Sequence, residues 1–572
     1  NHEPQRPPKA FPRSRPRATT LRRATMPPKS KSDANAACSA QSSRTPEESA
    51  QFGVSVAFLR LEFLPEVERK CPSGREAPYH EINKWMLCGD GARGSELRCP
   101  RDGKLGCSYV DAIDACHVAP ATALLSWTWT YTARTVVTSL VRWCEREGHD
   151  QAQVYIWQCA LCNNQFRFED IKNHNMWESS AKLQEEFMSR CLQESVRRGH
   201  GILSLLDPWH APVYLTRIWC IFEVWVAINQ GVRFTLILSE RAEGDLQNTL
   251  ANGKWKQQCN AVFDTIWVQK ATATAEADRR FILKLIDPTV PEDGDYSGSS
   301  PCHEVNKAVA QQMRWWLALT AAAPYEGGVA LSMKDRSTGQ GVRRGVRAAA
   351  NLLVSVGAHA RALQLLSHVE RAYQAAGATD TTDFAKLLKD MGTCHGRQGH
   401  FAEAMAYCRR AEVAYEQAGA TGTQHFAGLL ESMGAFHGDE GKLEEATELY
   451  RRAEAVFEQA GATNTVEFAH LLQTMGTNFL KQGHADDAMA LYRQAEATYE
   501  QTGLTNTVKF AHLLQHMGTW HDKQGHAEDA TKLYRRAEVA YERAGATSDR
   551  KCRRLRRKLA ARGHHEQTCV VI

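Results

Sequence analysis

The sequence predicts an α/β domain followed by an all-α solenoid of stacked helix pairs. Three observations lead to this fold class. Short apolar runs alternate with amphipathic stretches over residues 118–240, as strands alternate with helices in α/β proteins. A 42-residue repeat runs through the last two hundred residues, and stacked copies of one supersecondary unit produce such a period. Basic, proline-rich sequence precedes both regions and predicts a disordered N-terminus over residues 1–50.

The repeat is recognised by methionine, glycine and alanine residues that return every 42 positions. These residues are Met391-Gly392, Met433-Gly434, Met475-Gly476 and Met517-Gly518, then Gly399, Gly441, Gly483 and Gly525, then Ala404, Ala446, Ala488 and Ala530. A fifth, degraded copy precedes them, because Gly357 and Ala362 lie one period before Gly399 and Ala404. The repeats are therefore expected to occupy residues 345–546.

Each unit is predicted to contain two helices. Apolar residues recur at helical spacing over residues 384–398 and again over 401–417. Gly399 can adopt a positive φ and end the first helix. Gly392 lies inside that helix, where glycine costs about 1 kcal/mol relative to alanine. Its return in every unit therefore predicts that two helices approach closely there.

The order Leu388, Gly392, Gly399, Ala404 and Ala411 resembles the tetratricopeptide repeat pattern. The 42-residue spacing is similar to the longer version found in kinesin light chains. Tyr450, Tyr492 and Tyr534 occupy the aromatic position of the second helix, whereas Cys408 departs from it. The resemblance implies a curved surface that binds a peptide or protein ligand.

The α/β region is expected to form a parallel, doubly wound sheet. Its predicted strands are 123–127, 154–157, 201–206 and 234–238, and its main predicted helices are 132–147, 167–198 and 215–229. In such sheets ligands bind at the carboxyl ends of the strands. Those ends carry Trp127-Thr128-Trp129, the residues 162–165 and Asp207-Pro208-Trp209.

This region resembles a divergent Toll/interleukin-1 receptor (TIR) domain, of the kind joined to repeats in algal and protist proteins. The resemblance rests on Ser126-Trp127, Trp157, Asn164-Gln165, Asp207-Pro208-Trp209 and the run Tyr214 to Val224. It implies a flavodoxin-like sheet, with Glu223 as the catalytic carboxylate of NAD cleavage. The NAD-binding residues that it implies are Ser126, Trp129, Trp157, Asn164, Arg217 and Trp219. Gln158 departs from the pattern, because relatives usually carry an acid near this place.

Glu223 also has a structural interpretation, in which it pairs with Arg217 and holds its helix on the sheet. Many TIR domains have no enzymatic activity and act by self-association. Two functional classes therefore remain open: an adaptor whose repeats bind a partner while the TIR-like domain self-associates, and an NAD glycohydrolase regulated by the repeats. A cargo adaptor similar to kinesin light chains is a third alternative, although the N-terminal part shows no heptad repeat.

Length and composition limit the remaining possibilities. The 572 residues suffice for several domains: an extension at 51–117, the TIR-like domain at 118–290, a helix and linker at 291–344, the repeats, and a basic tail at 547–572. Seventeen cysteines without a signal peptide predict reduced thiols and a cytoplasmic location. No cysteine spacing predicts a metal site. The basic charge is concentrated at the two ends and the body is acidic, which argues against a nucleic-acid partner.

Both termini carry possible processing signals. Met26 could be the true start, and an organellar transit peptide is the competing interpretation of the basic N-terminal segment. The ending Cys569-Val570-Val571-Ile572 has the form of a prenylation signal. The basic run at 550–558 would add attraction to an anionic membrane, and Cys552 could carry an acyl chain. In the alternative interpretation, this basic run only caps the last helix.

Overall fold

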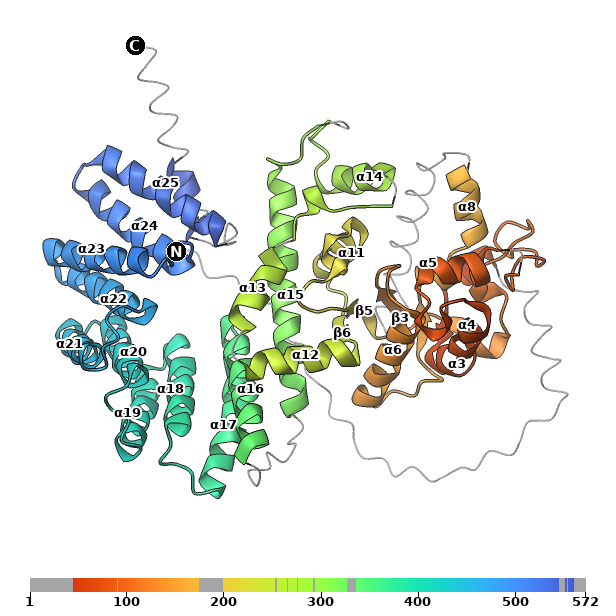
Figure 1. The fold of residues 1–572 in the computed structure, drawn as a ribbon. Coiled ribbons are helices and arrows are strands. Elements are labelled where there is room, and N and C mark those ends of the chain that lie inside the picture. The colour runs from red at the N-terminus through yellow and green to blue at the C-terminus, as the bar shows by residue number, and fades with distance from the viewer. Residues whose placement is uncertain are drawn as a thin grey trace, which may run out of the picture.

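The computed structural model describes residues 45–89, 91–173, 199–252, 255–264, 266–274, 276–291, 294–326, 336–544, 551–552 and 554–559. Figure 1 shows an α/β module at the N-terminal side and an arc of paired helices at the C-terminal side. The long helix α15 (Ser300–Glu326) lies between them. The predicted fold class, an α/β domain followed by a helical solenoid, is confirmed.

The described part of the α/β module contains one six-stranded sheet. Its strands are β1 (Phe52–Ser55), β2 (Val118–Pro120), β3 (Ala123–Ser126), β4 (Tyr155–Trp157), β5 (Gly201–Leu206) and β6 (Phe234–Leu238). The strand order is β2-β1-β4-β3-β5-β6. Strand β3 pairs in parallel with β4 and β5, and β5 pairs in parallel with β6. The four parallel strands, β4-β3-β5-β6, have the flavodoxin-like order.

The sheet is mixed, which differs from the purely parallel sheet that the sequence predicted. Strand β1 comes from the segment expected to be an extension, and it pairs antiparallel with both β2 and β4. A Cβ at Gly53 would lie 2.7 Å from the backbone carbon of Ile156, so glycine allows this pairing. The expected boundary at residue 117 therefore cuts through one sheet.

The segment before β2 is mostly helical. It contains α2 (Pro46–Gln51), α3 (Val56–Phe58), α4 (Leu64–Lys70) and α5 (Tyr79–Ile82), with π-helical turns at Leu59–Phe63 and Asn83–Leu87. Helix α2 begins within residues 1–50, which were predicted to be disordered, so residues 46–50 contradict that prediction. Residues 1–44 lie outside the described residues.

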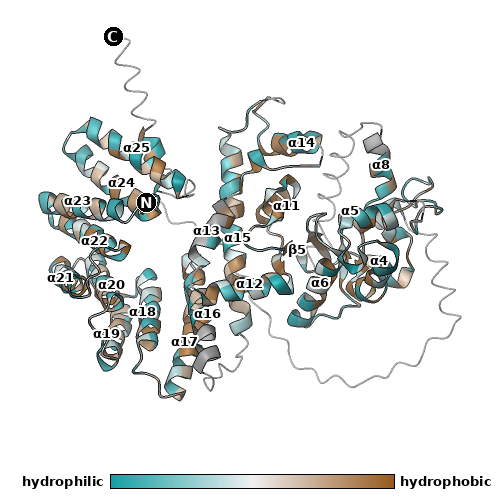
Figure 2. Cartoon of the chain, viewed as in Figure 1, coloured by the Kyte–Doolittle hydropathy of each residue, from teal (hydrophilic) through white to brown (hydrophobic). Residues whose placement is uncertain are grey.

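Helices follow the parallel strands as expected for α/β units. They are α6 (Ala133–Glu147), α7 (Cys159–Cys162), α8 (Gln165–Asn173), α11 (Ile218–Gln230), α12 (Glu240–Ala251), α13 (Trp255–Asp264) and α14 (Glu276–Ile286). Thr132 caps the start of α6 by accepting a hydrogen bond from the Thr135 amide at 3.2 Å. Gly231 ends α11 with φ of 63°, in the left-handed region. Figure 2 shows α11 as a predominantly hydrophobic helix, which agrees with its burial in the module.

Helix α15 joins the two parts of the chain. Trp316 of α15 stacks on Phe234 of β6, with ring centroids 3.7 Å apart. Tyr325, near the end of α15, hydrogen-bonds Gln247 of α12. The first repeat helix, α16 (Arg336–Ser355), packs against both α12 and α15. Helix α15 therefore contacts the α/β module through Trp316 and Tyr325 and the repeats through α16.

The solenoid contains five helix pairs within the described residues. They are α16 with α17 (His359–Ala375), α18 (Thr382–Arg397) with α19 (Phe401–Gln417), α20 (Gln424–Glu440) with α21 (Leu443–Gln459), α22 (Val466–Gln482) with α23 (Ala485–Gln501), and α24 (Val508–Lys523) with α25 (Ala527–Arg543). A glycine in the turn that follows the first helix of a unit is left-handed, with φ of 81° at Gly399 and 92° at Gly483. The predicted turn glycine is therefore confirmed.

In the second to fifth units, the recurring glycine inside the first helix makes room for a side chain of the second helix. A Cβ at Gly476 would lie 2.6 Å from Cε1 of Tyr492, and one at Gly434 would lie equally close to Tyr450. In the second unit the partner is Cys408, whose sulfur would lie 3.0 Å from a Cβ at Gly392. The close helix approach that the repeat predicted is confirmed.

Residues 551–552 and 554–559 form helical turns against the last repeat. Cys552 and Leu555 are fully buried there. Arg556 Nε lies 2.7 Å from a carboxylate oxygen of Glu538, and Lys558 Nζ lies 3.1 Å from the Tyr534 hydroxyl. Part of the basic run is thus paired within the chain, as expected if it caps the last helix pair.

Candidate functional site

Three polar side chains meet at the carboxyl end of β3. Ser126 is the last residue of β3, Tyr214 lies in the 3-10 turn Val213–Thr216, and Glu223 lies in the second turn of α11. The Ser126 hydroxyl donates a hydrogen bond to the Glu223 carboxylate and lies 2.6 Å from the Tyr214 hydroxyl. Strands β4 and β5 lie on opposite sides of β3 in the sheet. The carboxyl end of β3 is therefore the topological switch point, where the strand order reverses.

The surroundings of Glu223 are mainly apolar. Burial raises the pKa of Glu223 to about 7, against a smaller lowering by the Ser126 hydrogen bond. The buried thiols of Cys159 and Cys220 lie close enough for a negative charge on Glu223 to raise their pKa values further. Near neutral pH the carboxyl group is therefore divided between its protonated and ionised forms, the state suited to general acid or base chemistry.

Arg217 does not neutralise Glu223. Its guanidinium donates to the Thr274 hydroxyl at 2.8 Å, and its backbone bridges to Thr272. The structural interpretation, in which Arg217 pairs with Glu223, is wrong in this respect. Trp219 also points toward α14, because its indole nitrogen donates to Asp278 at 3.3 Å.

The remaining candidate residues are dispersed around the sheet edge. Trp129 is half-buried against Trp127, with ring centroids 5.5 Å apart. Trp157 is buried at the end of β4. Asn164 donates to the carbonyl of Gly106 at 2.8 Å and accepts from the Phe166 amide. Asn164 therefore anchors the start of α8, whereas Ser126 and Glu223 are joined by a direct hydrogen bond.

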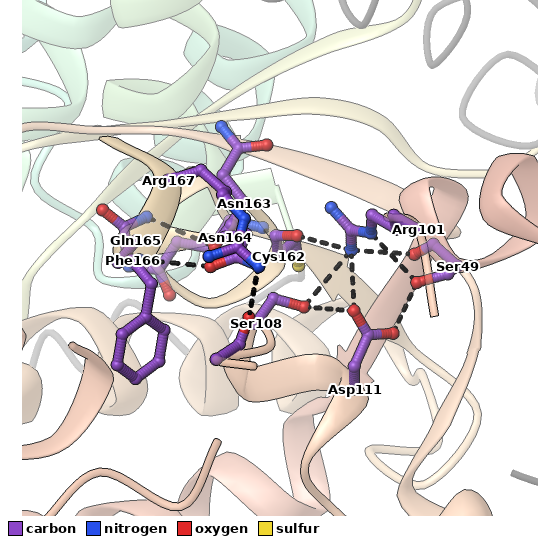
Figure 3. Close-up of polar contacts among 12 residues, drawn as sticks. Ser49, Arg101, Ser108, Asp111, Cys162, Asn163, Asn164, Gln165, Phe166 and Arg167 are labelled. Atoms are coloured by element: carbon purple, nitrogen blue, oxygen red, sulfur yellow. Dashed lines mark hydrogen bonds and ion pairs between the residues drawn. The ribbon is translucent and has the colours of Figure 1, made fainter. Parts of the chain in front are cut away.

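Figure 3 shows a polar cluster beyond the end of β4 that the sequence analysis did not identify. Arg101 donates to the carbonyls of Ser49 and Cys162, at 3.1 and 2.7 Å, and lies 3.3 Å from Asp111. Ser108 donates to the same carboxylate at 2.5 Å. The cluster ties the N-terminal segment to the parallel strands, because Ser49 and Cys162 lie 52 and 61 residues from the Arg101 that joins them. Such spacing leaves no local sequence signal.

The solenoid offers a second candidate site on its inner side. Figure 1 shows α18, α20, α22 and α24 along the inside of the arc, with their partner helices outside. Polar contacts link neighbouring first helices across this side: Arg347 Nη2 lies 2.8 Å from Asp390, and His470 Nδ1 lies 2.5 Å from Glu431. We call the following side chains the inner face: Arg344, Arg347, Asp383, Lys386, Lys389, His425, Glu431, Glu467, His470, Gln473, Lys509, His512 and Gln515.

Four cations gather on the inner face of the first two units. Desolvation lowers the pKa of Lys386, and the charges of Arg347, Arg344 and Lys389 lower it further against an opposing effect of Asp383. Arg347 is engaged by Asp390, and Lys386 Nζ lies 4.0 Å from Asp383. Lys389 is half-buried and makes no ion pair with a carboxylate of the described residues. We call Arg344, Arg347, Lys386 and Lys389 the cationic patch.

The expected modification sites differ in their accessibility. The fully buried side chain of Cys552 presents no thiol to an acyl donor in this arrangement. Cys569 lies outside the described residues. No helix in the described part of the chain is long and apolar enough to cross a membrane. No group of three or more metal-ligating side chains is found among the same residues.

Comparison with known proteins finds similarity only to solved structures. No family model and no curated protein matches the chain. A Podosopora anserina protein described as a kinesin light chain with nearly identical TPR-like repeats is 13% identical, covering 36% of this chain and 96% of its own, with a TM-score of 0.30. BtubC (BKLC) from P. vanneervenii is also 13% identical, covers 36% and 90%, and has a TM-score of 0.27.

A regulator of a different kind shows a comparable similarity. The Rap conjugation gene regulator of the plasmid pLS20, solved in complex with the Phr* peptide, is 11% identical, covering 52% of this chain and 95% of its own, with a TM-score of 0.30. These identities and TM-scores are low. The assignment of a tetratricopeptide-like repeat fold therefore rests on the helix pairs and their packing, as described above.

Proposed function

We propose that this protein is an adaptor whose repeats bind a peptide or helix of a partner protein on the inner face. One observation carries the proposal: the glycine and alanine packing positions recur unchanged in the last four repeats, whereas the inner-face positions differ from unit to unit. Asp383, His425, Glu467 and Lys509 occupy one such position, and Lys389, Glu431, Gln473 and Gln515 occupy another.

The contrast has a physical reason. A tyrosine ring of the second helix fills the space beside each of Gly434, Gly476 and Gly518. Packing alone therefore explains why these glycines recur. The side chains of the inner face meet no such helix-packing partner that would fix their identity. Each unit therefore offers a different contact to one extended ligand, as expected of a surface that recognises a sequence.

A peptide selection on the full chain tests this proposal. Peptides would be selected from a display library and their affinities measured for the full chain and two variants. Lys389→Ala changes the inner face, and Arg409→Ala changes an exposed residue on the outer helix α19 as a matched control. We expect selected peptides to lose affinity with the first variant alone. Peptides that respond equally to both variants, or a library that yields no binder, would contradict the adaptor proposal.

The adaptor proposal includes self-association of the α/β module, which the TIR resemblance implies. Light scattering on the full chain over a range of concentrations measures it directly. A mass that stays at one chain at all concentrations would remove this part of the proposal and leave peptide binding untouched. Binding to anionic vesicles, the expectation from the basic tail, is measured by co-sedimentation. The pairing of Arg556 and Lys558 with the last repeat supports the capping role instead.

The position of Glu223 favours NAD cleavage as a second candidate function. In that reaction the bond between nicotinamide and the ribose breaks, nicotinamide leaves, and water adds to the ribose carbon. A carboxylate stabilises the positive charge that develops on the sugar. Support comes from a partly buried carboxyl group, whose pKa is raised to about 7 by desolvation, at the switch point of the sheet.

The NAD candidate is tested by incubating the concentrated full chain with NAD and measuring free nicotinamide. Glu223→Gln preserves shape and the hydrogen bond from Ser126 but removes the charge. We expect turnover by the wild-type chain and none by this variant. Absence of turnover from the wild-type chain, with and without a selected peptide, would leave the adaptor as the function.

A further inference from the structure

A cavity of about 320 Å³ borders helix α14, which packs against α11 and α15 (Figure 1). On the other side of α14, Asp278 accepts a hydrogen bond from Trp219 of α11. The 3-10 turn Val268–Lys270 and residues 294–297 of the loop before α15 form the remaining walls of the cavity. The cavity is therefore separate from the site around Glu223, and its volume suits a small molecule.

Hydrogen bonds among its own residues hold the walls of this cavity in place. The Arg279 guanidinium donates to the carbonyl of Gln269 at 2.5 Å and lies 2.8 Å from the carboxylate of Glu276. Arg279 thus joins the 3-10 turn to α14 while Glu276 balances its charge. Asp295 accepts hydrogen bonds from the amide and the hydroxyl of Ser297, at 2.8 and 2.6 Å. A cavity held in this way loses little conformational freedom when a ligand binds.

Two cations at the cavity have no carboxylate partner within the described ranges. Arg280 is exposed and forms no ion pair there. Lys270 is also exposed, and its Nζ lies 4.8 Å from the centre of the Trp267 ring. A cation over an exposed aromatic ring contributes only about 0.5–1 kcal/mol. An anion can therefore draw the ammonium group away from Trp267 and leave the indole face open to a ligand.

The inner part of the cavity combines apolar surface with a hydrogen-bond donor. Leu283 and Tyr296 are 0% and 6% exposed. Gln269 is also 6% exposed, and its Oε1 accepts a hydrogen bond from Asn306 at 2.8 Å. Nε2 of the same amide is buried and donates to no atom in the described part of the chain. Leaving such a donor unsatisfied is costly, and an acceptor atom of a bound ring would remove that cost.

We propose that this cavity binds a nucleoside monophosphate, with its phosphate at Lys270 and Arg280 and its base between Trp267 and Leu283. A phosphate accepts charge-assisted hydrogen bonds from an ammonium and a guanidinium group at once. A base offers a flat face to the indole and ring acceptors to the free amide hydrogens of Gln269. The inference is independent of peptide binding by the repeats and of NAD cleavage.

The two carboxylates at the cavity favour a nucleotide with a single phosphate. Glu276 and Asp295 supply acceptors for ribose hydroxyls, as an acidic residue does in dinucleotide-binding folds. The same two charges oppose the further negative charge of a longer phosphate chain. Because only Lys270 and Arg280 are left to balance the ligand, a monophosphate should bind more tightly than a triphosphate.

Isothermal titration calorimetry on the full chain tests the proposal. The probes are AMP, which carries both recognised groups, adenosine and inorganic phosphate, which carry one each, and ATP. Arg280→Gln removes a phosphate-binding charge, and Arg409→Gln on the outer helix α19 is its matched control at an exposed position. Trp267→Leu removes the stacking surface. The melting temperature of each variant is measured first, to show that the chain still folds.

AMP should bind roughly tenfold or more tightly than adenosine, inorganic phosphate or ATP. Arg280→Gln should weaken AMP roughly tenfold and leave adenosine unchanged, whereas Arg409→Gln should change neither. Trp267→Leu should weaken AMP and adenosine to the same extent, roughly tenfold, as expected when a base loses its aromatic partner.

Three results would overturn this assignment. Equal affinity for AMP and inorganic phosphate would mean that charge alone is recognised. AMP binding that Arg280→Gln leaves unchanged would place the nucleotide elsewhere in the chain. Absence of AMP binding at millimolar concentrations would remove the site altogether. If Trp267→Leu lowers the melting temperature, Arg280→Gln and its control decide the matter alone.

Discussion

The outer face of the solenoid carries a ladder of ion pairs that is interrupted at one unit. In three units an arginine of the second helix reaches a glutamate of the preceding second helix: Arg410 to Glu370 at 2.5 Å, Arg452 to Glu412 at 2.9 Å, and Arg536 to Glu496 at 2.7 Å. The corresponding residue of α23 is Gln494, opposite Glu454. Burial raises the pKa of Glu454, with repulsion from Glu458 as a further cause.

The substitution Gln494→Arg should complete the ladder and stabilise the solenoid. The three existing arginine side chains are 46–48% exposed and their glutamate partners 12–21% exposed, so these pairs are only partly desolvated. Exposed pairs contribute about 0.2–1 kcal/mol each. Since Glu454 already bears the cost of its partial burial, we expect a gain in the upper half of that range, about 0.5–1 kcal/mol.

Urea denaturation of the full chain, followed by helix content, measures the gain. A double-mutant cycle with Glu454→Gln isolates the new pair, because Gln494→Arg should then add nothing. The gain should also shrink in 1 M salt and at acidic pH, where Glu454 becomes protonated. A gain that survives Glu454→Gln or high salt would refute the ion-pair explanation and indicate helix propensity instead.

Three other substitutions test the packing, the buried carboxyl and the tail. Gly476→Ala would place a Cβ 2.6 Å from Tyr492 and should destabilise the chain by about 1–3 kcal/mol in thermal unfolding; a smaller loss would mean that the ring moves aside. Glu223 has a folded pKa of about 7 against 4.5 for the free group, so the folded state binds more protons in this window and loses stability as pH rises through it. Glu223→Gln should therefore stabilise the chain at pH 8, by on the order of 2 kcal/mol, and hardly at pH 4.5; an equal effect at both pH values would contradict the shift. Leu555→Asp should detach the fully buried C-terminal turns and speed their cleavage by protease, and unchanged cleavage would argue against their docking.

The repeat helices were predictable from the sequence to within a few residues. The expected helix at 401–417 coincides with α19, and the expected helix at 384–398 is α18, Thr382–Arg397. Each unit contacts mainly its neighbours, so the residues that decide its packing recur at one short period. Apolar runs similarly identified the buried strands β5 and β6, whose ends agree with the prediction.

The arrangement of the candidate site was only partly predictable. Ser126 and Glu223 are 97 residues apart and do come together, because carboxyl ends of parallel strands meet the helices that follow them. Arg217 and Trp219 instead turn toward Thr274 and Asp278. Thr274 and Asp278 belong to a segment outside the recognisable motif. No local sequence pattern indicates whether Arg217 and Trp219 turn toward this segment or toward Glu223.

The amino-acid sequence by itself determined the helix pairs, their number and the α/β order of the module, because local propensity and short-range packing decide these features. Tertiary structure alone decided that β1 joins the sheet and that Glu223 is partly desolvated without gaining a cation. Each of these depends on contacts between segments far apart in the chain, where burial and charge are set by neighbours that sequence spacing does not reveal.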